Sequence, residues 1–120
     1  MQLRTAHVAL LLALSSMAFS QADDKEKAKL ASLTQTYTAS KAAYKKKPKD
    51  AKVKKTYVSS TVALGTATMN AGSLRPQVKY AGALRLYREA LAIDPKNKEA
   101  LANKKMIEDI YQSMGRPIPK

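Results

Sequence analysis

The chain has 120 residues, a formal net charge of +13 at pH 7, no cysteine and one histidine, His7. The lack of cysteine excludes disulfides and thiol nucleophiles, and His7 lies in a leader that we expect to be removed, which excludes His-dependent relays and the commonest zinc sites. The nine acidic residues are scattered without the spacing of an acid/base pair. We therefore expect a protein that is not an enzyme and that holds neither a metal nor a cofactor.

Residues 1–22 have the pattern of a secretory signal peptide. Arg4 gives a positive start, Val8 to Leu14 is apolar throughout, and Ser20-Gln21-Ala22 fits a small-x-small cleavage site. The apolar run is shorter than the roughly 20 residues that span a bilayer. We expect an exported chain, periplasmic or secreted, that begins near Asp23 and has no integral membrane segment. The alternative, an amphipathic first helix of the fold, is disfavoured because the apolar run has no polar face.

The first predicted helix of the mature chain spans about 24–46. Its apolar stripe has members three and four residues apart: Leu30, Leu33, Tyr37, Ser40 and Tyr44. Acidic residues from Asp23 to Glu26 would face the positive end of the helix dipole, and Lys45 to Lys47 the negative end. Pro48 stops this helix.

The second predicted helix spans about 51–71, with Asp50 as its N-cap and Gly72 supplying a left-handed residue after its end. Its buried line consists of Val53, Tyr57, Thr61, Leu64 and Thr68, widened by Val58, Val62 and Met69. The β-branched segment Tyr57–Val62 makes a strand a competing interpretation. We prefer a helix because residues 56–69 show no strict alternation of polar and apolar side chains.

Two further helices are predicted at 77–93 and 98–114, after a loop at 73–76. Asp94-Pro95 ends the third helix, Asn97 caps the fourth, and Gly115 closes the fourth. The third has the denser stripe: Tyr80, Ala83, Leu84, Tyr87, Ala90 and Leu91. The stripe of the fourth is Leu101, Ile107, Ile110, Tyr111 and Met114. These elements predict an all-α domain at 23–114, built as two antiparallel helical hairpins, and an extended tail at 115–120.

Residues 80–101, YAGALRLYREALAIDPKNKEAL, carry a spacing that resembles the tetratricopeptide repeat (TPR), a 34-residue helix–turn–helix unit. The matching positions are Leu64, Gly65, Gly72, Tyr80, Ala83, Tyr87, Ala90 and Pro95. The best-matching repeat spans about 58–97, and it departs from the family in a long inter-helix turn at 73–78. An earlier copy ending at Pro48 would be degenerate, and an unrelated four-helix bundle is the alternative.

The resemblance implies a short exported scaffold or adaptor, in which the first helices of successive repeats line a groove for a protein or peptide. Here that groove would draw on Lys52, Lys55 and Ser59, together with the fourth helix. Two hairpins form a very short solenoid whose outer face is left partly apolar. We therefore expect self-association or docking on a larger envelope assembly.

Seven lysines between residues 45 and 55 form a basic cluster: Lys45, Lys46, Lys47, Lys49, Lys52, Lys54 and Lys55. One interpretation is a solvated corner whose cations suit a helix end. The other is a polyanion-binding surface for anionic lipid, lipopolysaccharide, an acidic wall polymer or extracellular nucleic acid. A membrane-active amphipathic peptide is a weaker alternative, because the first helix has few bulky apolar groups.

Overall fold

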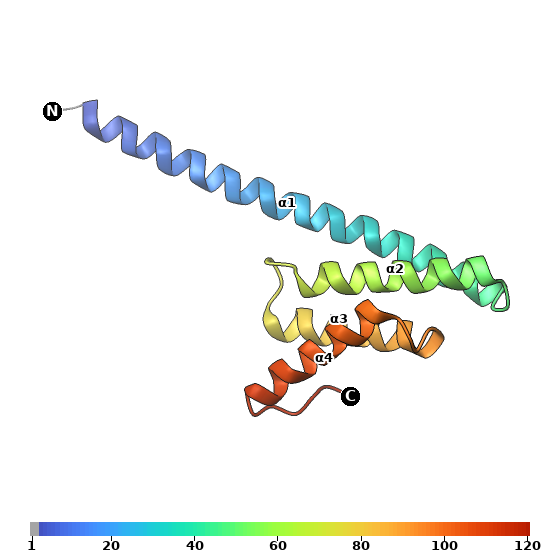
Figure 1. Ribbon diagram of the computed structural model, residues 1–120. Helices are drawn as coiled ribbons and strands as arrows, with labels where there is room; N and C mark the ends of the chain where they lie inside the picture. The colour runs from blue at the N-terminus through green and yellow to red at the C-terminus, as the bar shows by residue number, and fades with distance from the viewer. Residues whose placement is uncertain (1–2) are drawn as a thin grey trace.

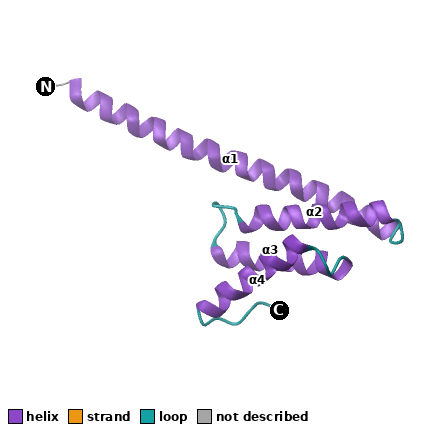
Figure 2. Cartoon of the chain, in the orientation of Figure 1, coloured by secondary structure: helices purple, strands orange, loops and turns teal. Residues whose placement is uncertain are grey.

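The computed structural model describes the backbone of residues 3–120 and the side chains of residues 21–120. Its helices are α1 (Leu3–Lys46), α2 (Ala51–Met69), α3 (Pro76–Ile93) and α4 (Lys98–Ser113). No strand occurs within residues 3–120 (Figure 2), which confirms the all-α class. The competing strand at Tyr57–Val62 is wrong, since this segment lies inside α2.

The helices form a small bundle in which each helix packs against the next along the chain. The chain reverses direction at each joint (Figure 1). The central element is α2, which contacts α1, α3 and α4. The described chain measures 74 × 36 × 19 Å. At a rise of 1.5 Å per residue a helix of 44 residues is about 66 Å long, so α1 sets the long dimension.

Helix α1 begins at Leu3 rather than near Asp24. No glycine or proline occurs between residues 3 and 46, so nothing in the local sequence interrupts the helix. Asp23 and Glu26 consequently lie within α1 of the full chain. The predicted dipole interaction concerns a chain that begins near Asp23, so it stays a prediction. The signal-peptide prediction covers residues 1–22. It stays a prediction, because the side chains of residues 1–20 lie outside those described.

Across the described residues, no helix combines the length and apolarity needed to cross a membrane.

The predicted N-caps of α2 and α4 are confirmed. The Asp50 carboxylate accepts a hydrogen bond from the Val53 N–H at 3.0 Å, and the Asn97 amide oxygen accepts one from the Ala100 N–H at 2.9 Å. Each cap satisfies one of the backbone donors that the first turn of a helix leaves without an internal partner.

The two glycines that were predicted to end helices, Gly72 and Gly115, behave differently. Gly115 has φ = 64°, and it ends α4 in a Schellman arrangement: its N–H donates to Gln112 O (3.0 Å), and the Arg116 N–H donates to Tyr111 O (3.0 Å). The prediction for Gly72 is wrong, because α2 already ends at Met69 with Asn70 as its C-cap (φ = −92°). Gly72 instead presents its N–H to a side chain of α1.

The turn between α2 and α3 lies at residues 70–75 rather than at the predicted 73–78, with the same length. Helix α3 begins at Pro76, so residues 76–78 form its first turn. Proline suits this position because its fixed φ is helical and its missing N–H would have no helical acceptor there. The TPR-like spacing is therefore interrupted by residues 70–75 rather than by 73–78.

The core lies between α2, α3 and α4. Its largest fully buried side chains are Tyr87, Leu84, Ile107 and Thr61. The predicted α3 stripe is confirmed, with four of its members buried: Ala83, Leu84, Tyr87 and Ala90. Tyr80 and Leu91 pack against the core while partly exposed.

The predicted stripe of α4 is only partly correct. Ile107 and Tyr111 are buried, but Leu101 is 47% exposed and Met114 is 51% exposed. Ala100, which is fully buried, faces the core in place of Leu101. The buried line of α4 therefore runs through Ala100, Ile107 and Tyr111, at helical spacings of seven and four, and the bulkier Leu101 lies beside that line.

The residues after α4 fold back on the bundle. Arg88 Nη1 donates to the Pro119 carbonyl at 2.7 Å, and Ile118 packs against the core cluster. The tail has no regular secondary structure, and these contacts attach it to α3.

Candidate groove between α1, α2 and the start of α4

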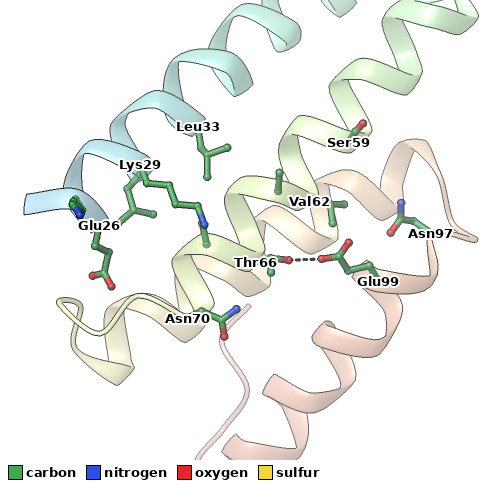
Figure 3. Close-up of a pocket in the computed structure, with 13 residues that line it drawn as sticks. Glu26, Lys29, Leu33, Ser59, Val62, Thr66, Asn70, Asn97 and Glu99 are labelled. Carbon is green, nitrogen blue, oxygen red and sulfur yellow. Dashed lines mark hydrogen bonds between the residues drawn. The ribbon is translucent and has the colours of Figure 1, made fainter. Parts of the chain in front are cut away.

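A groove of about 690 Å³ runs along one side of α2. One wall is the segment of α1 from Lys25 to Leu33, the other is α2 from Ser59 to Asn70, and Asn97 and Glu99 lie at the start of α4. In Figure 3, Lys29 and Leu33 extend from α1 toward α2, and Thr66 faces Glu99.

The α2 wall is one continuous helix face. Its lining residues are three or four positions apart and mostly small: Ser59, Val62, Ala63, Thr66, Ala67 and Asn70. Because residues at this spacing share a face, they form a shallow strip about 16 Å long at 1.5 Å per residue. Small side chains on such a strip allow a bound chain to approach the helix closely.

The α1 wall combines apolar and basic groups. Leu30 and Leu33 supply its apolar part, and Lys25 and Lys29 its cations. Both leucines are only half-buried in the described molecule. The predicted stripe of the first helix thus faces α2 as expected, but its N-terminal part lines a groove instead of a closed core.

A hydrogen-bond network fixes the α2 wall to the core. The Thr66 hydroxyl donates to Glu99 Oε1 at 2.8 Å, and because a hydroxyl has one proton, Thr66 accepts from the buried Tyr87 hydroxyl at 2.9 Å. Asn103 Nδ2 donates to the same Tyr87 oxygen at 3.0 Å. Burial raises the pKa of the Tyr87 phenol, which keeps this donor neutral.

Glu26 links the α1 wall to the loop after α2. Its carboxylate accepts from the Gly72 N–H (2.9 Å), the Ser73 N–H (2.9 Å) and the Ser73 hydroxyl. These hydrogen bonds hold the pKa of Glu26 below its ordinary value, and the bond from the Ser73 side chain has the largest effect. Burial acts in the opposite direction. This link fastens the outer end of the groove, which is the end farthest from the α1–α2 turn. Beyond it, the N-terminal part of α1 extends away from the other helices (Figure 1).

A polar cluster centred on Glu89 attaches α1 and α2 to α3. Its carboxylate accepts from the hydroxyls of Tyr37 (2.7 Å) and Tyr57, and it pairs with Lys41 Nζ at 2.8 Å. The Tyr57 ring also stacks on Tyr44, with centroids 5.0 Å apart. Tyr37 and Tyr44 of the first predicted stripe are therefore half-buried against α2, and Tyr57 of the second is buried.

Ionisation in this cluster follows from its geometry. Burial raises the pKa of Glu89, but the hydrogen bonds from Lys41, Tyr57 and Tyr37 outweigh that effect and hold the pKa below its ordinary value. Burial is the largest cause that raises the pKa of Tyr57 and of Tyr37, and the hydrogen bond of each phenol to Glu89 raises it further. The hydrogen bond to Glu89 raises the pKa of Lys41. The cluster is therefore one carboxylate shared by a cation and two neutral phenols.

A second hollow of about 470 Å³ adjoins the groove and shares Ser59 and Asn97 with it. It lies between the α1–α2 corner and the α3–α4 corner, with Val58 and Ile93 among its apolar residues. Three members of the basic cluster line it: Lys49, Lys54 and Lys55. The two hollows extend along α2 from Ala51 to Asn70.

The structure separates the three predicted groove residues. Ser59 lines both hollows and Lys55 lines the second one. Lys52 lies elsewhere, in a small cavity of about 160 Å³ between α1 and α2 that also contacts Ser40 and Ala43. Lys52 and Lys55 therefore border different hollows, and neither lines the groove itself. The fourth helix contributes to the groove only through its first turn.

The seven lysines of the basic cluster are all exposed. Lys45 and Lys46 occupy the last turn of α1, Lys47 and Lys49 lie in the turn, and Lys52, Lys54 and Lys55 follow on α2. The predicted placement of cations at the end of α1 is correct. Three lysines of the cluster line the second hollow, Lys52 lines the small cavity, and none of the seven lines the groove itself.

Four of the positions that carried the TPR resemblance lie where α2 and α3 pack together: Gly65, Ala83, Tyr87 and Ala90. Leu64 and Gly65 are buried on α2, and Ala83, Tyr87 and Ala90 on α3. A Cβ on Gly65 would lie 3.0 Å from Cε1 of Tyr87, so the two helices approach closely at this point. Gly72 and Pro95 are exposed in the two loops, and Tyr80 is partly buried.

Sequence reasoning missed the α1 wall of the groove and the Glu89 cluster. The signal for Glu89 was an acidic residue between Tyr87 and Ala90, inside the dense apolar stripe of α3, together with tyrosines on the preceding helices whose hydroxyls needed partners. The groove wall had no comparable signal, because Leu30 and Leu33 have the spacing of ordinary core residues.

Comparison with family models, with curated proteins and with solved structures found no match for this chain. The TPR resemblance therefore stays a prediction that depends on the residues named above.

Proposed function

We propose that the protein is a non-enzymatic, exported interaction module, a TPR-like adaptor that holds a segment of another protein in the groove beside α2. The observation that carries this proposal is the groove itself, about 690 Å³ in volume and lined on both sides by helix faces at three- and four-residue spacing. Export is inferred from the sequence pattern of residues 1–22 alone.

The construction of the groove supports a binding role. Its α2 wall is held by the buried Tyr87 hydroxyl through Thr66, and Glu26 fastens α1 at the outer end. A wall fixed before binding loses little conformational freedom when a ligand arrives, which favours affinity. The half-exposed Leu30 and Leu33 offer apolar surface that a partner would bury.

The test is a pull-down from nuclease-treated envelope extract with the purified protein, washed at rising salt. Ala63→Trp fills the groove from the exposed face of α2, and Ala39→Trp makes the same change on an exposed face of α1 outside the groove. We expect a discrete protein to be retained above about 0.5 M salt, where the Debye length is only a few ångströms. Ala63→Trp should lose this protein and Ala39→Trp should keep it. Equal capture by both variants would refute the groove as the binding surface.

A second candidate function, polyanion binding, is favoured by the exposure of all seven clustered lysines. Contacts of lysine with phosphate or sulfate release counterions, so such binding weakens steeply as salt rises. Glutamate substitutions at Lys45, Lys46, Lys47 and Lys49 should then abolish capture of lipid, glycan or nucleic acid. Retention that survives these substitutions and high salt would exclude this candidate.

A further inference from the structure

We propose that the occupant of the groove is an amphipathic α-helix of a partner protein with acidic residues along its flanks. This inference rests on the proposed function and specifies the partner of the same site. It follows from the shape of the two walls and from the state of the charged groups around them.

The shape favours a helix. Both walls are helix faces, and the main-chain N–H and C=O groups of residues inside a helix are already bonded within it, so neither wall offers an edge to which an extended strand could pair. The small α2 strip, centred on Ala63 and Ala67, admits a third helix at the usual interaxial distance of about 8–10 Å. The strip from Ser59 to Asn70 accommodates about 11 residues of helix, and the two hollows together about 19.

The apolar part of the groove has the arrangement that such a helix needs. Leu30 and Leu33 line it from α1 and Val62 from α2, and Figure 3 shows Leu33 extending toward α2. An incoming helix with leucines at i, i+3 or i+4, and i+7 would set these anchors between the two walls. Burying each leucine removes apolar surface from water on both partners.

The charges favour an acidic partner. The groove and the adjoining hollow contain three carboxylates, and each already accepts a hydrogen bond: Glu26 from the Gly72 N–H, Glu99 from the Thr66 hydroxyl, and Asp94 from the Lys96 N–H (3.2 Å). Five lysines line the same two hollows: Lys25, Lys29, Lys49, Lys54 and Lys55. Among the described side chains, none of these lysines takes part in a salt bridge.

The carboxylates already accept hydrogen bonds and the lysines form no salt bridge among the described side chains, and this difference favours a partner with negative charge. A basic partner would compete with the protein's own donors for carboxylates that hold the loop after α2 and the start of α4. An acidic partner would meet cations at both ends of the groove, Lys25 and Lys29 on α1 and the three lysines near the α1–α2 corner. Such complementarity raises the association rate and disfavours basic competitors.

The experiment uses fluorescein-labelled peptides of about 18 residues, long enough for the two hollows together. The first peptide places leucines on one helical face and glutamates on its flanks. The second has the same composition with the leucines redistributed around the helix. In the third, lysines replace the glutamates, and the fourth repeats the first with a central proline. Binding to the purified protein is followed by fluorescence anisotropy, and helix formation by circular dichroism.

We expect the first peptide to bind at least about tenfold more tightly than each of the others, with a gain of helical signal. Ala63→Trp should weaken it by at least about tenfold, and Ala39→Trp should leave it unchanged. Glutamates at Lys25 and Lys29 should weaken the acidic peptide and strengthen the lysine peptide.

Several results would overturn the inference. Equal binding of the redistributed peptide would show attraction by charge alone, and equal binding of the proline peptide would show an extended occupant. If no peptide binds while Ala63→Trp still abolishes capture of a protein from extract, the helix is refuted and the adaptor function survives. If Ala63→Trp affects neither assay, both are refuted.

Discussion

The contact between Gly65 and Tyr87 allows a quantitative test of how closely α2 and α3 approach. Replacing glycine by alanine inside a helix normally stabilises it by about 1 kcal/mol, because alanine loses less backbone entropy on folding. At Gly65 the added Cβ would lie 3.0 Å from Tyr87 Cε1 and 3.3 Å from both Cδ1 and Cζ. These distances are shorter than ordinary van der Waals contact, so the ring or the helix has to move.

The ring has little freedom to move. Tyr87 is fully buried, and its hydroxyl is held by Thr66 at 2.9 Å and by Asn103 at 3.0 Å. Overpacking in such a site typically costs about 1–3 kcal/mol. Subtracting the propensity gain, we expect Gly65→Ala to lower the unfolding free energy by up to about 2 kcal/mol.

Gly82→Ala is the matched control. Gly82 also lies inside a helix, α3, but its added Cβ would meet only Thr68 Cγ2 at 3.5 Å, an ordinary contact. We expect this variant to be stabilised by up to about 1 kcal/mol. The two variants share the same change in propensity, so their difference isolates the overpacking, about 1–3 kcal/mol. Urea denaturation followed by circular dichroism measures both.

A double-mutant cycle with Tyr87→Phe sharpens the test. Removing the hydroxyl frees the ring from Thr66 and Asn103, so Gly65→Ala should cost less in that background than in the parent. If Gly65→Ala stabilises the protein as much as Gly82→Ala does, the close approach is refuted. If the substitutions at 65 and 87 are simply additive, the fixed ring is refuted.

Two further predictions concern charge and capping. Because the folded-state pKa of Glu89 is held below its ordinary value of 4.5, its ionised form contributes stability that is fully present above about pH 4.5 and is lost as pH falls through the lowered value. Glu89→Gln should therefore lower the unfolding free energy by about 1–3 kcal/mol at pH 7, and the variant should lose less stability than the parent on acidification. Thermal unfolding between pH 3 and 7 measures both effects, and an unchanged pH profile would contradict the prediction. Asn97→Ala should cost about 1 kcal/mol, because it removes the acceptor of the Ala100 N–H, whereas Asn97→Ser should be close to neutral in urea denaturation. Equal costs for the alanine and serine variants would show that the cap contributes nothing.

The features that the sequence predicted well are those set by local chemistry. Asp50 and Asn97 are N-caps because their side chains bond to an N–H three residues later, and Pro48 ends α1 whatever lies around it. The buried face of α3 was equally clear, since Tyr87 and Ala90 belong to a dense stripe at helical spacing. In each case the information lies within one or two turns of helix.

The features that the sequence did not predict depend on contacts between distant segments. The pairing of α4 with the core places Ala100 inside and leaves Leu101 exposed, which its own pattern does not indicate. The Glu89 cluster joins side chains that are 32 and 52 residues apart in the chain. Gly72 was expected to end α2 through its backbone, but its N–H bonds to Glu26 on α1.

The two walls of the groove are attached to the bundle by different kinds of contact. The α2 wall is part of the core: Thr66 bonds to the buried Tyr87, and its neighbour Gly65 lies against the Tyr87 ring of α3. The α1 wall is attached mainly by polar links, Glu26 at the outer end and the Glu89 cluster nearer the α1–α2 turn, with half-buried leucines between them. The Glu26 link lies at an exposed site, where hydrogen bonds contribute little net stability, so opening of the groove should begin at that end of α1 and leave α2 in place. Binding of a partner that buries Leu30 and Leu33 would then stabilise the less firmly held wall against the fixed one.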